Sequence, residues 1–116
     1  MALSELETRR IAKTVEAFIE QRRPAPHIRP RLDLCFRIVG QSVEIFEVRP
    51  RRTDGPGEWI ENNVAKATFI RSKNIWKVYW QRADLKWHRY PEAPEVGSIN
   101  QFLALVAEDK YACFFG

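Results

Sequence analysis

Residues 64–90 read VAKATFIRSKNIWKVYWQRADLKWHRY, and this stretch decides the fold. It holds three runs in which apolar and polar residues alternate, at 64–71, 75–81 and 85–90, with short polar turns between them. Alternation with a period of two is typical of half-buried strands, and short polar turns join antiparallel neighbours. The stretch therefore predicts three consecutive strands of an antiparallel meander.

The register of these strands follows if their turns have even lengths. We then expect Phe69 to face Val78, Ala67 to face Trp80, and Trp80 to face Trp87. The small side chain of Ala67 leaves room for the indole of Trp80. This agreement between side-chain size and register supports the meander.

Two further strands precede the meander. Residues 32–38 alternate apolar and polar side chains, and a second strand runs to about residue 49. Gly40 and Gln41 form a plausible two-residue hairpin loop, with glycine first as a type II′ turn requires. This loop pairs Arg37 with Glu44, which is a favourable cross-strand charge pair.

A helix is predicted on each side of the strands, over 4–22 and 98–108. Both begin with a capping box, Ser-x-x-Glu from Ser4 and Ser-x-x-Gln from Ser98, and both carry an apolar stripe. The pattern predicts an α+β domain with an N-terminal helix, an antiparallel meander of about five strands over 32–90, and a C-terminal helix. We expect both helices to pack on one face of the sheet.

The connecting segments carry further expectations. Prolines in 21–31 predict an extended, stiff connector. Composition predicts a loop over 50–63, in which Trp59 folds back onto the sheet edge or, alternatively, contacts a ligand. The tail 109–116 ends on a pair of phenylalanines and is expected to dock on the domain.

Composition narrows the class of protein. The 116 residues fit a single domain, 1–116, with 45% hydrophobic residues and a net charge of +4. No apolar run approaches the length that spans a bilayer, and the N-terminus lacks the pattern of a secretory signal. Cys35 and Cys113 are expected to be reduced thiols, with a disulfide between them as the lesser alternative. These features predict a cytoplasmic protein with no membrane partner.

The predicted sheet has one face for the core and one face with a distinct chemistry. The tryptophans of the meander fall on the face that the helices cover. The opposite face would carry Lys66, Thr68, Lys77, Tyr79, Gln81, Lys86, His88 and Tyr90. Lysines beside aromatic rings on an open sheet can hold phosphates and stack bases. The same residues are also common on any solvated strand face.

Four arginines near the end of the first helix would add positive charge to such a face. They are Arg22, Arg23, Arg29 and Arg31.

Motifs for catalysis or cofactor binding are absent. The sequence has no phosphate-binding loop, no dinucleotide fingerprint and no nucleophile elbow, and two histidines are too few for a typical zinc site. We therefore expect no metal and no cofactor. A small enzyme would have to use Asp84, His88 or Asp109 in a pocket.

Residues 75–90, with Ala65-Lys66 before them and 109–116 after them, resemble a bacterial family catalogued as domain of unknown function 3024. The resemblance covers most of the chain, although Ala112 stands where a glycine is expected. It implies a bacterial cytosolic protein and assigns no activity.

The resemblance also implies that the hairpin of residues 76–88 recurs in the family. Core packing explains its tryptophans but does not explain Arg82, Asp84 or His88, which are therefore candidate site residues.

The function predicted from the sequence is a small non-catalytic binding or interaction module. Nucleic-acid binding through the basic and aromatic face is one alternative, and a small enzyme of unknown class is another. The partner stays open between a protein, a second copy of the chain and nucleic acid. The candidate binding residues are Lys66, Lys77, Tyr79, Arg82, Asp84, Lys86, His88 and Tyr90.

Overall fold

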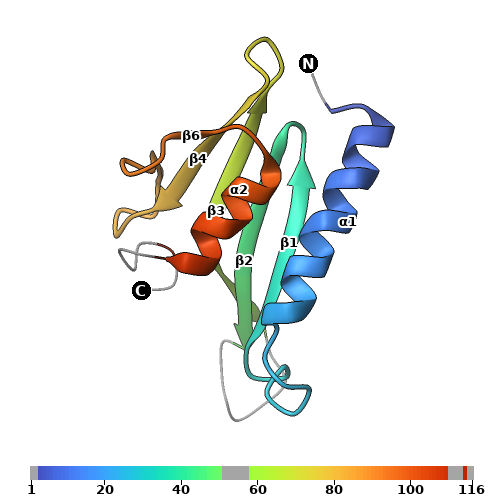
Figure 1. The fold of residues 1–116 in the computed structure, drawn as a ribbon. Coiled ribbons are helices and arrows are strands. Elements are labelled where there is room, and N and C mark those ends of the chain that lie inside the picture. Colours follow the sequence, from blue (N-terminus) through green and yellow to red (C-terminus); the bar gives the residue numbers. More distant parts are fainter. Residues whose placement is uncertain (1–2, 51–57, 110–113, 115–116) are drawn as a thin grey trace.

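A computed structural model describes residues 3–50, 58–109 and 114 of the chain, and it shows two helices on one face of an antiparallel sheet (Figure 1). The strand order is β1-β2-β3-β4-β5, and β6 also pairs with β4. The elements are α1 (Glu5–Arg22), β1 (Asp33–Val39), β2 (Ser42–Pro50), β3 (Trp59–Ile70), β4 (Ile75–Gln81), β5 (Trp87–Arg89), β6 (Glu95–Val96) and α2 (Ile99–Glu108). The predicted α+β class is confirmed.

The capping box of α1 is present as predicted. The Ser4 hydroxyl accepts from the Glu7 N–H at 3.1 Å, and the Glu7 carboxylate accepts from the Ser4 N–H at 2.9 Å. Two N–H groups that the first turn leaves without a helical partner are thereby satisfied. The helix buries Ile11, Val15 and Ile19 against the sheet.

The connector after α1 is folded into turns, so the prediction of an extended segment is wrong. The N–H of Ile28 donates to the carbonyl of Ala25 at 2.8 Å, and the N–H of Leu32 donates to that of Ile28 at 3.0 Å. Prolines remove N–H groups only at their own positions, and the residues between them are free to close turns. Arg23 then binds Asp33 through two hydrogen bonds, of 2.9 and 2.7 Å. This pair fixes the end of α1 to the start of β1.

The first hairpin has the predicted register. Arg37 lies opposite Glu44, and their side chains form an ion pair at 3.0 Å. Gly40 has a φ of +59°, a region that L-residues enter at a cost. The glycine therefore allows the two-residue turn.

Strand β3 begins earlier than predicted, at Trp59, so the expected loop is wrong over residues 59–63. Trp59 pairs with Pro50, and its side chain is 56% exposed instead of folded back onto the sheet. The polar sequence Glu-Asn-Asn at 61–63 suggested a loop, but β2 is long enough to offer it a ladder of hydrogen bonds. Pairing with a neighbouring strand overrides weak β-propensity.

The β3–β4 hairpin is shifted by two residues from the predicted register. Phe69 lies opposite Trp76 and Ala67 lies opposite Val78, with a four-residue turn over 71–74. Because side chains alternate between faces, a shift of two residues leaves every side chain on its predicted face.

The β4–β5 hairpin is shifted by one residue, and this shift exchanges the faces of β5. Trp80 lies opposite His88 because the loop has five residues, 82–86, with Leu85 at a φ of +63°. His88 and Tyr90 therefore lie on the helix-covered side and Trp87 lies on the opposite side. The prediction that His88 and Tyr90 lie on the open face is wrong.

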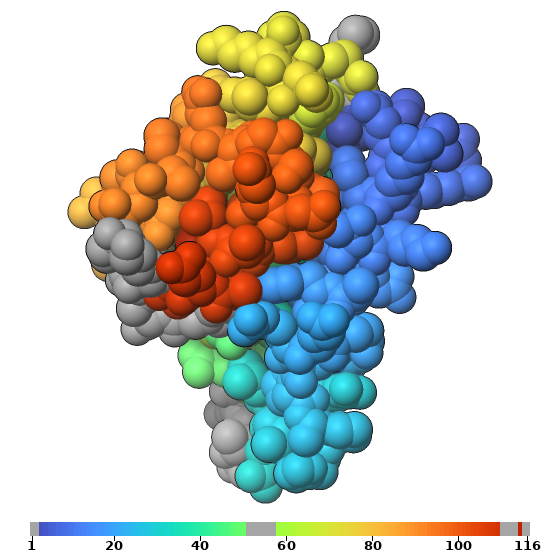
Figure 2. Space-filling model, viewed as in Figure 1, coloured from blue at the N-terminus to red at the C-terminus, as the bar shows by residue number. Residues whose placement is uncertain are grey.

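Helix α2 follows the two-residue strand β6, which the sequence did not predict. Ser98 accepts from the Gln101 N–H at 3.2 Å, while the Gln101 side chain accepts from the Gly97 N–H at 2.6 Å. Of the two bonds of the predicted capping box, the one to the Ser98 hydroxyl is present, while the Gln101 side chain binds the N–H of Gly97 instead of that of Ser98. Phe102, Leu103 and Val106 are buried on the predicted stripe. The side chains of α1 and α2 meet in front of the sheet and largely hide it (Figure 2).

Phe114 is the one described residue beyond Asp109, and it is 6% exposed. Its N–H donates to the Asp109 carboxylate at 2.9 Å, and its ring centroid lies 4.8 Å from that of Tyr90. Tyr90 is itself 2% exposed. Tyr90 is thus a core residue. The rest of the predicted docked tail, 110–113 and 115–116, lies outside the described residues.

Candidate functional site

The face of the sheet that neither helix covers holds a cluster of basic and aromatic side chains. We call this cluster the open face. It comprises Lys66 and Thr68 of β3, Lys77, Tyr79 and Gln81 of β4, and Trp87 and Arg89 of β5. The pairing of Lys66 with Tyr79, and of Tyr79 with Arg89, places the central three side chains next to one another.

Two rings on the open face share one cation. The Lys66 Nζ lies 5.6 Å from the Tyr79 ring centroid and 5.8 Å from the Trp87 ring centroid. Arg89 adds a second cation 5.8 Å from the Tyr79 ring. Both distances from Lys66 lie within the range of a cation–π contact. The arrangement presents π-surfaces and positive charge over three adjacent strands.

The three cations of the open face, Lys66, Lys77 and Arg89, differ in whether they already bind other groups of the protein. Arg89 donates to the Pro94 carbonyl at 2.9 Å and lies 3.5 Å from the Glu95 carboxylate. Lys66 and Lys77 form no ion pair within the described residues. The two lysines are therefore less engaged than Arg89, although each has a glutamate opposite it in the neighbouring strand, Glu44 for Lys66 and Glu95 for Lys77.

On the same side of the sheet, over β1 to β3, one guanidinium is shared by two carboxylates. Arg37 binds Glu44 at 3.0 Å and Glu61 at 2.9 Å, and its guanidinium lies 4.3 Å from the Phe46 ring. The hydrogen bonds that Arg37 donates to Glu61, and then to Glu44, raise the pKa of Arg37. Lys66 of β3 and Lys77 of β4, which form no ion pair within the described residues, are the cations that an anion would meet on this side of the sheet.

Asp84 and His88 form a local pair at the tip of the β4–β5 hairpin. The Asp84 Oδ2 lies 2.8 Å from the His88 Nε2, and the Oδ1 accepts from the Lys86 N–H at 3.0 Å. The Lys86 N–H lowers the pKa of Asp84 most, and His88 lowers it further. These bonds close the turn. An aspartate in a turn commonly accepts a hydrogen bond from the backbone N–H two residues further along.

Arg82 belongs to the same hairpin tip. Its guanidinium lies 5.7 Å from the ring of Trp80, which is opposite His88. The structure thus brings Arg82, Asp84 and His88 together, and their contacts are made within the β4–β5 hairpin itself. Three cavities of about 430 to 660 Å³ lie elsewhere and are lined by other residues.

The remaining candidates for catalysis lie apart from this tip. Asp109 ends α2 and accepts from the Phe114 N–H, which is a structural role. Cys35 is a free thiol on β1, at the other end of the strand order from His88, so these two form no nucleophile and base pair. Burial raises the pKa of the Cys35 thiol. Cys113 lies outside the described residues.

The arginines around the end of α1 do not extend the open face. Arg23 is paired with Asp33 and Glu20, and Arg29 donates to the Pro24 carbonyl at 3.0 Å. Helix α1 packs on the covered side of the sheet (Figure 1). The expected help from Arg22, Arg23, Arg29 and Arg31 therefore has no structural support.

Sequence reasoning missed Trp87 and Arg89 as residues of the open face. The prediction assumed a loop with an even number of residues after β4, and this assumption placed Trp87 on the core side of the sheet. The available signal was Asp84-Leu85-Lys86, because an aspartate side chain tends to accept from the backbone N–H two residues on and so form a turn of its own. Lys66, Lys77 and Tyr79 lie on the face to which the sequence assigned them.

Two properties of the described residues bear on function. Neither helix is long and apolar enough to cross a membrane. The described ranges also contain no group of three histidine, cysteine, aspartate or glutamate side chains that could hold a metal ion.

Comparison with known proteins places the chain in one family. The model of the family described as a domain of unknown function, DUF3024, matches residues 3–116. The comparisons with curated proteins and with solved structures found no match. The match spans every helix and strand of the structure. The chain therefore belongs to the DUF3024 family.

Proposed function

We propose that the protein is a non-catalytic binding module of the bacterial cytoplasm, and that its open face binds single-stranded nucleic acid. The observation that carries the proposal is the pair of rings, Tyr79 and Trp87, that both lie within about 6 Å of the Lys66 ammonium, at 5.6 and 5.8 Å. Bases stack on such rings and phosphates bind such cations. The family resemblance supports the bacterial and cytoplasmic setting.

A single strand fits the open face better than a duplex does. The rings lie on a sheet surface, and bases reach such rings only when they are unstacked from their own neighbours. A protein partner is a weaker match, because lysine is depleted at the centre of protein interfaces. The charge pattern points the same way, since Lys66 and Lys77 form no ion pair within the described residues.

The test is fluorescence anisotropy with labelled oligouridylate and oligothymidylate of about 12 nucleotides, a length within the usual site size. We expect binding at low salt and a slope of log K against log salt of about −1.4, since two lysines contact phosphates. Tyr79→Ala and Trp87→Ala should each weaken binding by roughly 5- to 150-fold, the equivalent of one lost stack. Tyr79→Phe retains the ring and should retain most of the affinity.

A matched pair of charge variants separates the open face from general basicity. Lys66→Gln with Lys77→Gln should flatten the salt slope, while Lys13→Gln on α1 with Lys73→Gln in the β3–β4 turn should leave it unchanged. The proposal fails if neither oligonucleotide binds at low salt. It also fails if the aromatic variants bind as well as the wild type.

A further inference from the structure

The two helices leave a groove between them on the covered side of the sheet, where the side chains of α1 and α2 meet (Figure 2). We call it the interhelix groove. Its volume is about 660 Å³. Its walls are Lys13, Thr14, Ala17, Phe18, Gln21 and Arg22 of α1, and Asn100, Leu103, Ala104 and Ala107 of α2.

The walls combine an apolar floor with small side chains at the rim. Leu103 is 5% exposed and Phe18 is partly buried, so they supply apolar surface at the bottom. Ala17 and Ala104 are exposed and Ala107 is partly exposed, and none of them has atoms beyond Cβ to fill the space. Small residues on facing helices allow a third helix to approach closely.

The charge of the groove has one sign. Its lining includes two cations and no carboxylate. Within the described residues neither Lys13 nor Arg22 forms an ion pair, and Arg22 lies 5.5 Å from the Phe18 ring. Glu20, the carboxylate nearest to Arg22 in sequence on the same helix, is bound to Arg23 at 3.0 Å.

We propose that the interhelix groove docks an acidic amphipathic helix of a partner protein. The apolar side chains of that helix would pack on Phe18 and Leu103, and its carboxylates would face Lys13 and Arg22. Recognition of an amphipathic helix in an apolar groove is a recurring binding mode, and charges at the rim select the partner. This surface is separate from the open face, because the sheet lies between them.

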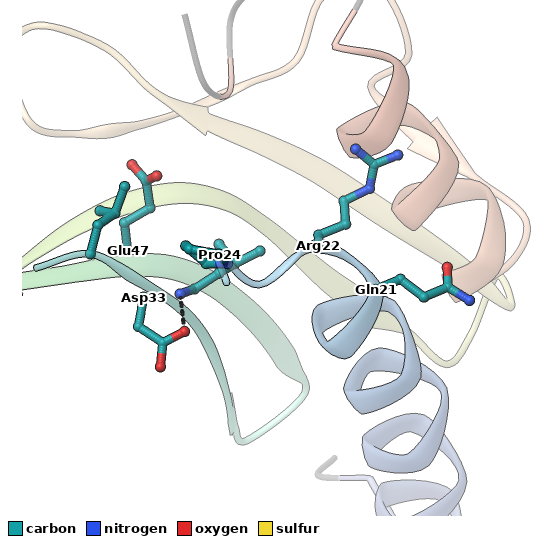
Figure 3. Close-up of a pocket in the computed structure, with 7 residues that line it drawn as sticks. Gln21, Arg22, Pro24, Asp33 and Glu47 are labelled. Carbon is teal, nitrogen blue, oxygen red and sulfur yellow. Dashed lines mark hydrogen bonds between the residues drawn. The ribbon is translucent and has the colours of Figure 1, made fainter. Parts of the chain in front are cut away.

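The length of the docked segment follows from α1. Residues 13 to 22 span roughly 14 Å along the helix axis, which is between two and three turns. A second cavity begins at the C-terminal end of α1 and shares Gln21 and Arg22 with the groove. In Figure 3 the Arg22 side chain points toward α2, while Asp33 and Glu47 lie on the other side of Pro24. Asp33 is paired with Arg23, so Glu47 is the carboxylate there that repels an acidic chain, and the acidic part of the docked helix ends at Arg22.

The experiment titrates the full-length protein with a synthetic peptide of about 14 residues. The peptide has leucine at positions i, i+3, i+4 and i+7 and glutamate elsewhere, and its control has glutamine in place of glutamate. Amide chemical shifts of the protein report the site. We expect changes clustered at Ala17, Leu103 and Ala104, and weaker binding of the glutamine peptide.

Two variants and their matched controls decide the proposal. Lys13→Glu with Arg22→Glu should weaken binding of the glutamate peptide by at least about tenfold, because like charges repel across the contact. Ala104→Trp should fill the groove and block binding. Lys73→Glu with Lys86→Glu, and Ala83→Trp, place the same changes in exposed turns and should have no effect.

The proposal is overturned by any of three results. The first is equal binding of the two peptides, the second is a set of shifted amides outside the groove, and the third is unchanged affinity in the Lys13→Glu, Arg22→Glu variant. If that variant instead abolishes oligonucleotide binding, then the groove is an anion site for nucleic acid, and the peptide proposal is wrong. Loss of peptide binding leaves the open-face proposal standing, because different residues carry it.

Discussion

At the scale of single residues, Glu7 joins two parts of the molecule that are distant in sequence. Its carboxylate closes the capping box at Ser4 and also accepts from the Arg71 guanidinium at 2.6 Å. The hydrogen bond from Arg71, and then that from the Ser4 backbone, lower the pKa of Glu7 from 4.5 to about 2. The start of α1 is thereby fixed to the β3–β4 turn.

This pair predicts a pH dependence of stability. The folded pKa lies below the unfolded one, so the ionised carboxylate stabilises the fold above about pH 4.5, and this contribution disappears as the pH falls toward about 2. Glu7→Gln keeps a capping side chain and removes the charge. In urea denaturation, the wild type should be the more stable at pH 7, and the difference should vanish near pH 2. A difference independent of pH would refute the role of the charge.

At the scale of elements, the sequence correctly predicted the features that depend on interactions between residues close together in the chain. The capping serines predicted the starts of both helices, and Gly40 with Arg37 and Glu44 predicted the register of the first hairpin. Each of these signals acts between residues that are close in sequence, which is why they could be seen without the structure.

The sequence did not predict the loop length or the strand boundary at the places where a turn-closing side chain or pairing with a neighbouring strand determines them. The Asp84 carboxylate closes a five-residue loop, and that one extra residue moves Trp87 to the open face. The first five residues of β3 are extended because β2 pairs with them, although three of the five, Glu61, Asn62 and Asn63, are polar. The sequence therefore assigned Lys66 and Tyr79 to the face on which the structure has them, but it assigned the second ring, that of Trp87, to the opposite face.

The first hairpin supplies a prediction at this scale. Nothing lies within 4 Å of a Cβ built on Gly40, so Gly40→Ala meets no steric clash and incurs only the backbone cost of its φ of +59°. That cost is about 1 kcal/mol for an L-residue. Gly40→Asn should cost less, since asparagine tolerates this region better. Equal urea midpoints for the alanine variant and the wild type would contradict the turn geometry.

At the scale of the whole molecule, the sheet separates two surfaces of different chemistry. The open face carries rings and lysines, and the covered side carries the interhelix groove. Between them lies a core that includes Val15 of α1, Val78 of β4 and Phe102 of α2, each fully buried. A single small domain could thus bind a nucleic acid and a protein at the same time without competition.

The core is completed by Phe114, and this predicts a large effect of a change that lies in neither surface. Phe114→Ala removes the ring that packs on Tyr90 and should destabilise the fold by about 3 kcal/mol or more. Val39→Ala, at a side chain that is 56% exposed, is the matched control and should change stability by less than about 0.5 kcal/mol. Urea denaturation measures both, and a small effect of Phe114→Ala would show that the aromatic contact contributes little.

The same contact has a consequence for folding during synthesis. A nascent chain that has emerged as far as Glu108 contains every described helix and strand, yet the ring of Tyr90 still lacks Phe114 as its neighbour. We therefore expect the part of the core around Tyr90 to close only after residue 114 has been added. Until then the unfinished protein exposes an aromatic surface, which is the feature that makes incomplete chains prone to aggregation.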